Sequence, residues 1–468
     1  MSQSAQLLLM LILLAPFWYR LQRDFISGLC YGMVILIACT HFLRIPLPGA
    51  LPELTIHRII IISLFVAWIR RPKEIALRDV PLARHILIWS GIAFISLLGS
   101  IDHATSIKRY FDYVLEFFLL YFILSTTVRD RGSAFRILRS AGIGLFIVAG
   151  LAFLEKYAGI NVVERFILTE AVPLGDVTAT YRHRILLGTG MAMAWPLAFW
   201  FSANESTTKD RVKWWVCLVA VLSACYFSRS RGPWLAAVLA GFVIFAFGSV
   251  LTRKRLLVVL ALAAVILLAR PGVLGTITGL AEATTDTESL KGGTFLYRLE
   301  LWRVAVSEVA ESPWRLLFGY GPGTGATQAV QWDLSYRDRE FAVTSWDNDF
   351  AYSLFQYGFL GLIATFVLYG TLAWRLLSHG RKLAGQERDF FVCLAACTLV
   401  LFFMMSNVMI FARQLYYLLW TVAALGYILK NCDTPKPVFE TGNDCPPAGW
   451  AGEGLTQTLT GVASGVAK

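Results

Sequence analysis

The sequence has little charge for its length. Only 16% of its 468 residues are Asp, Glu, Lys or Arg, against about a quarter in a typical soluble domain. Hydrophobic residues make up 57% of the chain, and its mean hydropathy is +0.60. This profile excludes a soluble protein of this size and indicates a polytopic α-helical membrane protein.

Cysteine and histidine are also scarce, and neither has the spacing of a metal site. None of the eight cysteines lies in the longest polar stretch, which argues against a disulfide framework and leaves them as packing residues. No pair of the six histidines has zinc-ligand spacing. The cysteines are Cys30, Cys39, Cys217, Cys225, Cys393, Cys397, Cys432 and Cys445. The sequence therefore predicts no metal and no cofactor.

Apolar runs divided by short polar connections predict about 12 to 13 transmembrane helices. The lower number applies if the first, marginal run does not span; we expect a retained helix there, because no basic residue precedes it. The predicted spans are residues 5–19, 24–43, 57–70, 84–101, 107–128, 134–154, 185–203, 213–228, 232–251, 255–270, 349–375, 390–411 and 414–430. The fold class is therefore all-α, with a transmembrane domain over 1–430 that includes one long outer loop at 271–348. Residues 431–468 are expected to form a disordered cytoplasmic tail.

The basic residues give the orientation. The net charge of +11 comes mainly from short connections, so the positive-inside rule explains it and nucleic-acid binding is not indicated. Four connections are crowded with arginine and lysine: residues 70–84, 129–139, 253–255 and 375–388. All four fall on one side if the spans alternate, and that side should be cytoplasmic. The opposite side then holds 155–184, 228–233 and the long loop at 271–348.

The long outer loop is predicted to contain an amphipathic helix and a tight turn. Apolar residues recur at helical spacing from Phe295 to Val309 (Leu296, Leu299, Trp302, Ala305, Val306 and Val309), which favours a helix lying on the membrane face. Pro313 should end it. The glycines from Gly319 to Gly323, including Gly321, force a turn. This turn could present N–H groups to an anion, but it lacks P-loop residues, and a plain turn is the simpler interpretation.

Three groups of arginines lie on the outer side, where few bases are expected. They are Tyr181-Arg182-His183-Arg184, then Ser228-Arg229-Ser230-Arg231-Gly232, and finally Arg298 with Arg303 behind it. Guanidinium groups bind phosphate oxygens in a bidentate manner, so a converging set would suit a lipid-linked diphosphate. The alternative is that some pair with acidic neighbours or touch lipid headgroups. His183, the one histidine among them, is either a satisfied polar residue or a participant.

Two carboxylates flank Asn348 at the start of the predicted span at 349–375. Asp347 and Asp349 could cap that helix, or one could cap it while the other acts as a general base towards a sugar hydroxyl. A third interpretation is an Asp-x-Asp metal site, but nothing nearby indicates a nucleotide-binding fold. Carboxylates at membrane depth are costly, which favours a functional role.

Four of these segments together follow the motif order of one family. Ser230-Arg231-Gly232 resembles its S-R-G turn, and Arg182 or Arg184 with Gly188 resembles the arginine that opens an earlier helix. Arg298 to Trp302, Pro313 and Gly319 to Gly323 resemble its R-x-x-x-W…P…G-x-G-x-G segment, and Asp347-Asn348 with Gly358 and Gly361 resembles H-N-x-x-L…G-x-x-G. Residues 180–365 thereby resemble the superfamily of O-antigen ligases and O-antigen/exopolysaccharide polymerases, which are bacterial inner-membrane glycosyltransferases.

The resemblance implies an inverting, metal-independent glycosyl transfer of the GT-C type at the periplasmic face. The donor would be a glycan on undecaprenyl diphosphate, with Arg182, Arg184, Arg231, Arg298 and Arg303 holding the diphosphate. Arg184 and Arg298 would stabilise the leaving group and Asp347 would be the base, supported by Asn348, Asp349, His183, Gly319 and Gly321. The acceptor would be a glycan or lipid A-core, with membrane lipid around the site and a chain-length regulator as a candidate partner.

One departure from the family pattern affects the choice of reaction. The family's ligases place a histidine where this chain has Asp347, and the outer loop contains no histidine. We therefore expect a polymerase that extends a repeat-unit polysaccharide, with a ligase as the alternative. A flippase or transporter is a second alternative, for which Asp112 and Glu116 near Arg109 would need a role, although no paired broken helices support it.

Overall fold

The computed structural model describes residues 3–40, 43–45, 53–71, 73, 75–168, 177–269, 290–326, 333–336, 339–342 and 346–432. The predicted tail lies outside the described residues from 433 onward, as do several parts of the predicted outer loop. The described residues are almost entirely helical, with two short antiparallel strand pairs, β1 (Arg44–Ile45) with β2 (Leu54–Thr55) and β3 (Asp333–Tyr336) with β4 (Arg339–Ala342).

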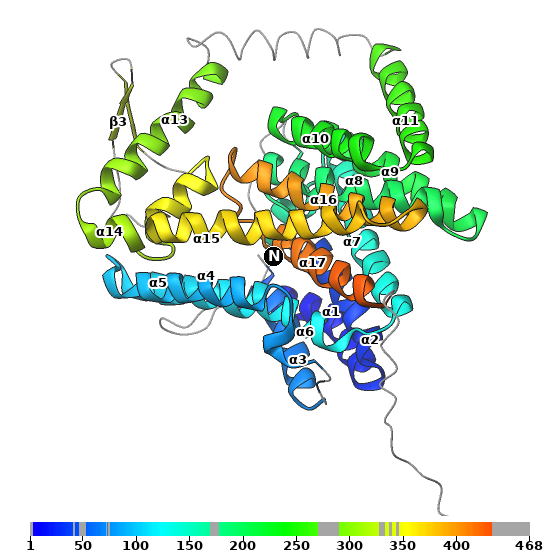
Figure 1. Ribbon diagram of the computed structural model, residues 1–468, viewed down its shortest axis with the longest axis horizontal. Coiled ribbons are helices and arrows are strands. Elements are labelled where there is room, and N and C mark those ends of the chain that lie inside the picture. Colours follow the sequence, from blue (N-terminus) through cyan, green and yellow to red (C-terminus); the bar gives the residue numbers. More distant parts are fainter. Residues whose placement is uncertain are drawn as a thin grey trace, which may run out of the picture. The chain divides into compact units, whose positions relative to one another are not determined.

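Every predicted span overlaps a helix (Figure 1). In the first half these are α1 (Gln3–Arg23), α2 (Phe25–Ala38), α3 (Ile56–Ile69), α4 (Ala83–Ser96), α5 (His103–Phe111), η3 (Asp112–Phe118, a π-helix), α6 (Leu119–Thr127), α7 (Arg131–Ala158) and α8 (Arg184–Asn204). Then follow α9 (Thr208–Phe227), α10 (Arg231–Phe247), α11 (Val250–Ala269), α13 (Leu290–Val309), α14 (Pro313–Phe318), α15 (Asp349–Gly380), α16 (Gly385–Met405) and α17 (Arg413–Cys432). Short helical turns lie at η1 (Leu77–Asp79), η2 (Leu97–Gly99), η4 (Val163–Leu168) and η5 (Thr324–Ala326).

Local sequence signals set where many of these helices begin. The side chain of Asp130 accepts a hydrogen bond from the backbone N of Ser133 at 2.7 Å and caps α7. Thr207 caps α9 in the same way through the backbone N of Asp210. Such caps satisfy N–H groups that a helix leaves without partners, which explains why short polar connections interrupt the apolar runs so cleanly.

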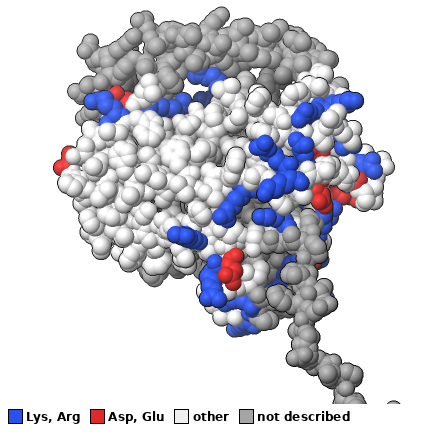
Figure 2. All heavy atoms as spheres, viewed as in Figure 1, with Lys and Arg blue, Asp and Glu red and all other residues white. Residues whose placement is uncertain are grey.

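Six helical segments in the described part of the chain are long and apolar enough to cross a membrane. They are Ser4–Arg23, His103–Thr127, Arg131–Ala158, Arg184–Asn204, Asp349–Gly380 and Gly385–Met405. Four shorter apolar helices accompany them: Phe25–Ala38, Ile56–Ile69, Ala83–Gly99 and Arg231–Phe247. Large apolar side chains such as Leu87 and Ile363 are exposed on the bundle, and one face shows a broad area without charge (Figure 2). The predicted fold class, an all-α polytopic membrane protein, is confirmed.

The basic connections gather at one end of the bundle. Arg131 pairs with Glu387 at 2.7 Å, and Arg388 Nε donates to the carbonyl oxygen of Phe247 at 2.6 Å. Arg139 forms a bidentate ion pair with Glu205, which lies between α8 and α9. These contacts join the connections before α7, α9, α11 and α16, so the alternation of spans expected from the sequence holds at this end. Lys and Arg side chains collect towards one side of Figure 2 accordingly.

The helix α15 is broken, although the sequence suggested one continuous span at 349–375. Gly358 has φ 64° and ψ −168°, values that only glycine adopts without strain. Phe350 and Phe366, equally far from Gly358 on either side, stack with ring centroids 4.5 Å apart. The segment from Asp349 to Tyr357 therefore folds back against the segment after Gly358. With a rise of about 1.5 Å per residue, Asp349 lies roughly 13 Å from the tip of this hairpin along its axis.

The outer segment before α15 forms α13 and α14, as predicted in kind but not in detail. Leu301, Ala305 and Val309 of α13 are fully buried, whereas Leu299 and Val306 are about half exposed. The buried side therefore shares Ala305 and Val309 with the predicted apolar face but also includes Leu301, and α13 contacts α15. Pro313 does not only end α13: it begins α14, with Ser312 as the N-cap.

Candidate functional site

The glycine turn after α14 holds the tip of the α15 hairpin. Because Gly358 interrupts the helix, the carbonyl oxygens of Phe355 and Gln356 are released to accept from the N atoms of Tyr320 and Gly321, each at 2.9 Å. A Cβ on Gly358 would lie 2.4 Å from the carbonyl carbon of Leu317. The two glycine-rich segments therefore fit each other backbone to backbone.

The contacts of the glycine turn agree with the plain turn preferred from the sequence over an anion-binding turn. The N–H of Gly319 donates to the carbonyl oxygen of Arg315 at 2.7 Å, and that of Gly321 to Gln356. The N–H of Gly323 donates to the side-chain oxygen of Gln356. All three donors serve the turn itself, so the plain-turn interpretation describes Gly319 and Gly321, and both act by positioning the hairpin.

Asn348, and neither of the two aspartates, caps the inward-pointing start of α15. Its side-chain oxygen accepts hydrogen bonds from the N atoms of Phe350 and Ala351, both at 3.1 Å. The capping role considered for Asp347 and Asp349 thus belongs to the residue between them. Asp347 is half-buried and Asp349 is buried, so both carboxylates are held at the base of the hairpin rather than at its outer tip.

Arg298 of α13 meets Asp347 and Arg231 at this point. Its Nε donates to the carbonyl oxygen of Asp347 at 3.2 Å. Burial lowers the pKa of the Arg298 guanidinium, the negative charge of Asp347 raises it, and the positive charge of Arg231 lowers it further. Three residues from separate elements, α10, α13 and the start of α15, therefore share one electrostatic environment.

The outer end of Arg298 is available for a ligand. Its two terminal nitrogens make no hydrogen bond to any residue that the structure describes. The positive charge of Arg231 beside the Arg298 guanidinium creates a positive potential that an anion would relieve. A planar fork beside a second arginine is the arrangement that binds phosphate oxygens.

The start of α8 is packed against the turn that carries Arg231. A Cβ on Gly188 would lie 2.6 Å from the Ser228 hydroxyl and 2.7 Å from Cβ of Pro233, so α8 approaches α10 as closely as only glycine allows. Arg184, the first residue of α8, is exposed one turn before Gly188. Arg184 therefore lies at the same end of the bundle as Arg231.

A buried polar cluster fixes the segment that delivers Arg182 and Arg184. Glu155 at the end of α7 accepts hydrogen bonds from the N atoms of Thr178 and Ala179, at 3.0 and 2.7 Å. Asn161 donates to both Glu155 and the Thr178 hydroxyl at 2.8 Å. Arg182 follows with φ 58°, a left-handed backbone that is strained for arginine. His183 faces the ring of Phe411 at 5.9 Å between centroids.

Arg303 lies apart from this group in its contacts. Its guanidinium pairs with Glu300 on the same helix, and its side chain is 69% exposed. The hydrogen bond and the charge of Glu300 raise its pKa. Of the arginines predicted to bind diphosphate, Arg298 contacts Asp347 and feels the charge of Arg231. Arg182 and Arg184 precede Gly188, which packs against the turn before α10, and Arg303 lies on the exposed side of α13.

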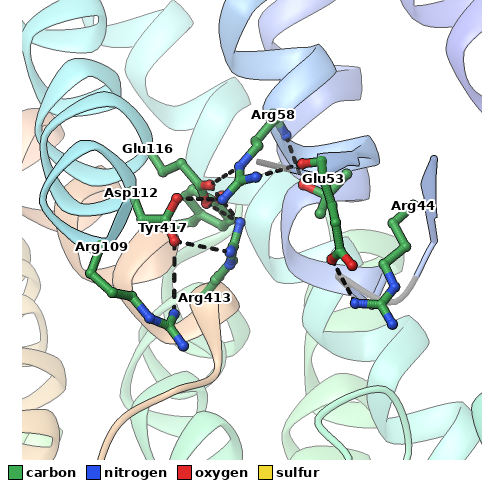
Figure 3. A network of polar contacts seen from close by, with 9 residues as sticks. Arg44, Glu53, Arg58, Arg109, Asp112, Glu116, Arg413 and Tyr417 are labelled. Carbon is green, nitrogen blue, oxygen red and sulfur yellow. Dashed lines mark hydrogen bonds and ion pairs between the residues drawn. The ribbon is translucent and has the colours of Figure 1, made fainter. Parts of the chain in front are cut away.

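A second arginine–carboxylate group, largely missed from the sequence, joins α3, η3 and α17 (Figure 3). Glu116 on the π-helix η3 accepts from Arg58 Nε of α3 at 2.6 Å and from Arg413 Nη1 of α17 at 2.6 Å. Arg58 also pairs with Asp112, and Tyr417 Oη donates to Glu116 at 3.1 Å. We call Arg58, Asp112, Glu116 and Arg413 the buried ionic network. Arg58 and Arg413 are isolated basic residues at the starts of α3 and α17. From the sequence, only Asp112 and Glu116, two carboxylates within a predicted span, indicated a polar group here.

Within the described residues, no group of three or more His, Cys, Asp or Glu side chains is arranged to hold a metal ion.

The fold and this arginine-rich site define a polytopic α-helical membrane protein whose outer loop and helix ends form one polar site. Residues 216–366, from α9 to α15, match the family model described as O-antigen ligase. This match supports the O-antigen ligase and polymerase superfamily for this part of the chain, and a function of that general ligase or polymerase type. No curated protein matches the chain. The matched residues include Arg231, Arg298, Asp347 and Gly358.

Proposed function

We propose that the protein polymerises oligosaccharide repeat units carried on undecaprenyl diphosphate. It acts as an inverting, metal-independent glycosyltransferase at the periplasmic face of the bacterial inner membrane. The observation that carries the proposal is the meeting of Arg298, Arg231 and Asp347 at the base of the α15 hairpin, with the Arg298 fork unoccupied by any described residue.

The arginines serve the leaving group in this mechanism. As the bond between the anomeric carbon and the diphosphate oxygen breaks, negative charge grows on the diphosphate. In this proposal Arg298 and Arg231 surround the place where that charge develops, and Arg184, the first residue of α8, joins them when the donor binds. Pre-positioned donors in a partly buried site stabilise developing charge without reorganising, which is a major source of rate enhancement.

Asp347 serves the acceptor. Its carboxylate takes the proton from a sugar hydroxyl, whose oxygen then attacks the anomeric carbon from the side opposite the diphosphate, giving inversion. The backbone carbonyl of Asp347 is held by Arg298, which links the position of the base to that of the leaving-group binder. A positioned general base contributes roughly a hundredfold to ten-thousandfold to the rate.

A ligase is the second candidate, and the description of the matching family favours it. The two reactions share the donor and the chemistry but differ in the acceptor, which is a growing glycan for a polymerase and lipid A-core or a protein for a ligase. The polymerase is supported by Asp347, which stands where the ligases of the resembling family have a histidine.

The test is reconstitution of the purified protein in lipid vesicles with an undecaprenyl-diphosphate repeat unit. A ladder of lipid-linked products supports the polymerase, and glycan on added lipid A-core supports the ligase. If the donor is only moved across the bilayer without a new glycosidic bond, the protein is a flippase and the proposal is wrong.

The variant Asp347→Asn is expected to lower ladder formation at least a hundredfold, because the amide cannot accept the proton. Asp210→Asn, at the far end of the bundle in the exposed pair with Lys213, is the matched control and should keep full turnover. Equal turnover in the two variants would remove Asp347 from the mechanism.

A further inference from the structure

A narrow aromatic pocket adjoins the arginine site and has no part in the mechanism above. Its walls come from α4, η3, α15, α16 and α17, and include the rings of Trp89, Tyr113, Phe117, Tyr416 and Trp420. Phe117 and Tyr416 stack at 4.5 Å, which fixes one wall. The pocket is formed only because the α15 hairpin folds back, since it is lined both by residues before Gly358 and by residues after it.

Asp349 supplies the pocket's one carboxylate. The residue is 6% exposed, and Tyr416 Oη donates to its Oδ2 at 3.4 Å, a long hydrogen bond. Among the described residues no arginine or lysine pairs with it, in contrast to the carboxylates of the buried ionic network. A buried carboxylate without a cation is costly unless other donors satisfy it, so a donor from a ligand would lower that cost.

Two further polar atoms around the pocket have unused hydrogen-bonding capacity. The Oη of Tyr357 and the Nε1 of Trp420 are buried and have no hydrogen-bond partner among the described residues. Tyr357 is held by its ring against Trp89, 5.2 Å between centroids, so its hydroxyl is not needed for packing. Buried polar groups are nearly always satisfied in native proteins, and those left over in a pocket commonly have a ligand or water as partner.

The pocket is connected to the arginine site through its rim. Asp349 is separated from Asp347 only by the capping residue Asn348. Met405 lines the pocket, and the preceding Met404 packs against Gly232, the residue after Arg231. A group attached directly to a diphosphate held by Arg231 and Arg298 would therefore be next to the pocket.

We propose that this pocket binds a hydroxyl substituent of the sugar directly attached to the diphosphate, with Asp349 and Tyr357 as specificity-determining residues. The inference rests on the proposed function. The chemistry fits: a sugar hydroxyl donates to Asp349 and accepts from the Trp420 indole, and a pocket of about 20 Å³ has room for one such small group. Pockets with aromatic walls and few polar groups characteristically bind small neutral groups in this way.

The experiment compares binding of two probes to the full-length protein in vesicles: undecaprenyl diphosphate, and undecaprenyl diphosphate carrying one N-acetylhexosamine. Asp349→Asn should weaken the sugar-bearing probe about tenfold and leave the bare lipid unchanged, because only the sugar reaches the pocket. Tyr357→Phe should weaken the sugar-bearing probe roughly fivefold. In turnover assays both variants should raise KM more than they lower kcat.

Two controls keep the outcomes distinct. Tyr121→Phe removes the hydroxyl of a buried tyrosine of α6 outside the pocket and should leave both probes unaffected. Arg298→Lys should weaken both probes. If Arg298→Lys weakens both but the pocket variants weaken neither, the pocket holds only water and this inference fails while the proposed function stands. If Arg298→Lys weakens neither probe, the proposed diphosphate site itself is wrong.

Discussion

The protein contains two groups of arginines and carboxylates that differ in how completely they are paired. In the buried ionic network, Glu116 alone accepts hydrogen bonds from Arg58, Arg413 and Tyr417, and Asp112 pairs with Arg58. At the base of the α15 hairpin, Arg298 touches only a backbone oxygen of Asp347 and stands close to another arginine. The first group satisfies its own charges, whereas in the second the terminal nitrogens of Arg298 have no hydrogen-bond partner among the described residues.

The same residue types therefore have different roles: the buried ionic network stabilises the fold, whereas the arginines at the hairpin base are suited to binding a substrate. A saturated network has no capacity left for a substrate, but it fixes where α3, η3 and α17 meet, and α17 supplies the Tyr416 wall of the aromatic pocket. A guanidinium fork such as that of Arg298, whose terminal nitrogens have no partner among the described residues, gains its partner from an anion. The π-helix at Asp112–Phe118 brings Asp112 and Glu116 to the same pair of arginines.

The largest expected effect is on stability and comes from Glu116→Gln. Removing this charge leaves Arg58 and Arg413, which are only 11% and 13% exposed, with Asp112 alone, and breaking a buried ion pair typically costs about 3 to 5 kcal/mol. Thermal unfolding in detergent should show a large fall in Tm. Protein that remains folded should still bind the bare lipid diphosphate. A normal Tm would mean that the network is not a structural element.

The hairpin is tested by Gly358→Ala. The new Cβ would collide with the backbone at Leu317, and the φ of 64° would become strained, so we expect a loss of about 2 to 3 kcal/mol and a fall in turnover. Gly370→Ala on the same helix is the matched control. It meets nothing within 4 Å and should be neutral or slightly stabilising, as expected for alanine in a helix. Equal unfolding temperatures would argue against the break at Gly358.

The open site is tested by Arg298→Lys, which keeps the charge but removes the planar fork. We expect ladder formation to fall roughly tenfold to a hundredfold, corresponding to about 1.4 to 2.7 kcal/mol, because a point charge cannot make the bidentate contact. Stability should hardly change, since the arginine donates a single hydrogen bond to the protein. Turnover at the original rate would indicate that no phosphate binds the fork.

The smallest effect is expected for Arg303→Ala. The arginine pairs with Glu300 at the surface, where solvent screens the pair and its contribution to stability is small. Rates of ladder formation and unfolding temperatures should match those of the original protein. A fall in turnover comparable to that of Arg298→Lys would instead restore Arg303 to the diphosphate site.

Much of the helical layout follows directly from local sequence, because apolar runs and capping residues act over a few positions. The runs that gave the spans coincide with α1 to α11 and α15 to α17, and caps such as Asp130 mark their starts. The candidate residues Arg231, Arg298 and Asp347 stood out for the same reason: charge in an otherwise apolar chain at the end of a span has few structural explanations.

The partners of Glu116 could not be read in this way. Arg58 and Arg413 each look like an ordinary base at a helix start, and they are separated by hundreds of positions along the chain. The buried face of α13 was likewise predicted only in part. Ala305 and Val309 are buried as expected, but Leu299 and Leu301 are equally apolar, and only tertiary packing decides that Leu301 is the buried one.

The sequence by itself determined that this chain is an all-helical membrane protein with arginines and carboxylates at the helix ends, since hydropathy and charge are properties of short segments. Only the tertiary structure decided that α15 turns back at Gly358 and takes Asp347 and Asp349 inward. The reason is that a glycine permits a break but does not impose it: the carbonyls of Phe355 and Gln356 can leave the helix only where Tyr320 and Gly321 are present to bind them.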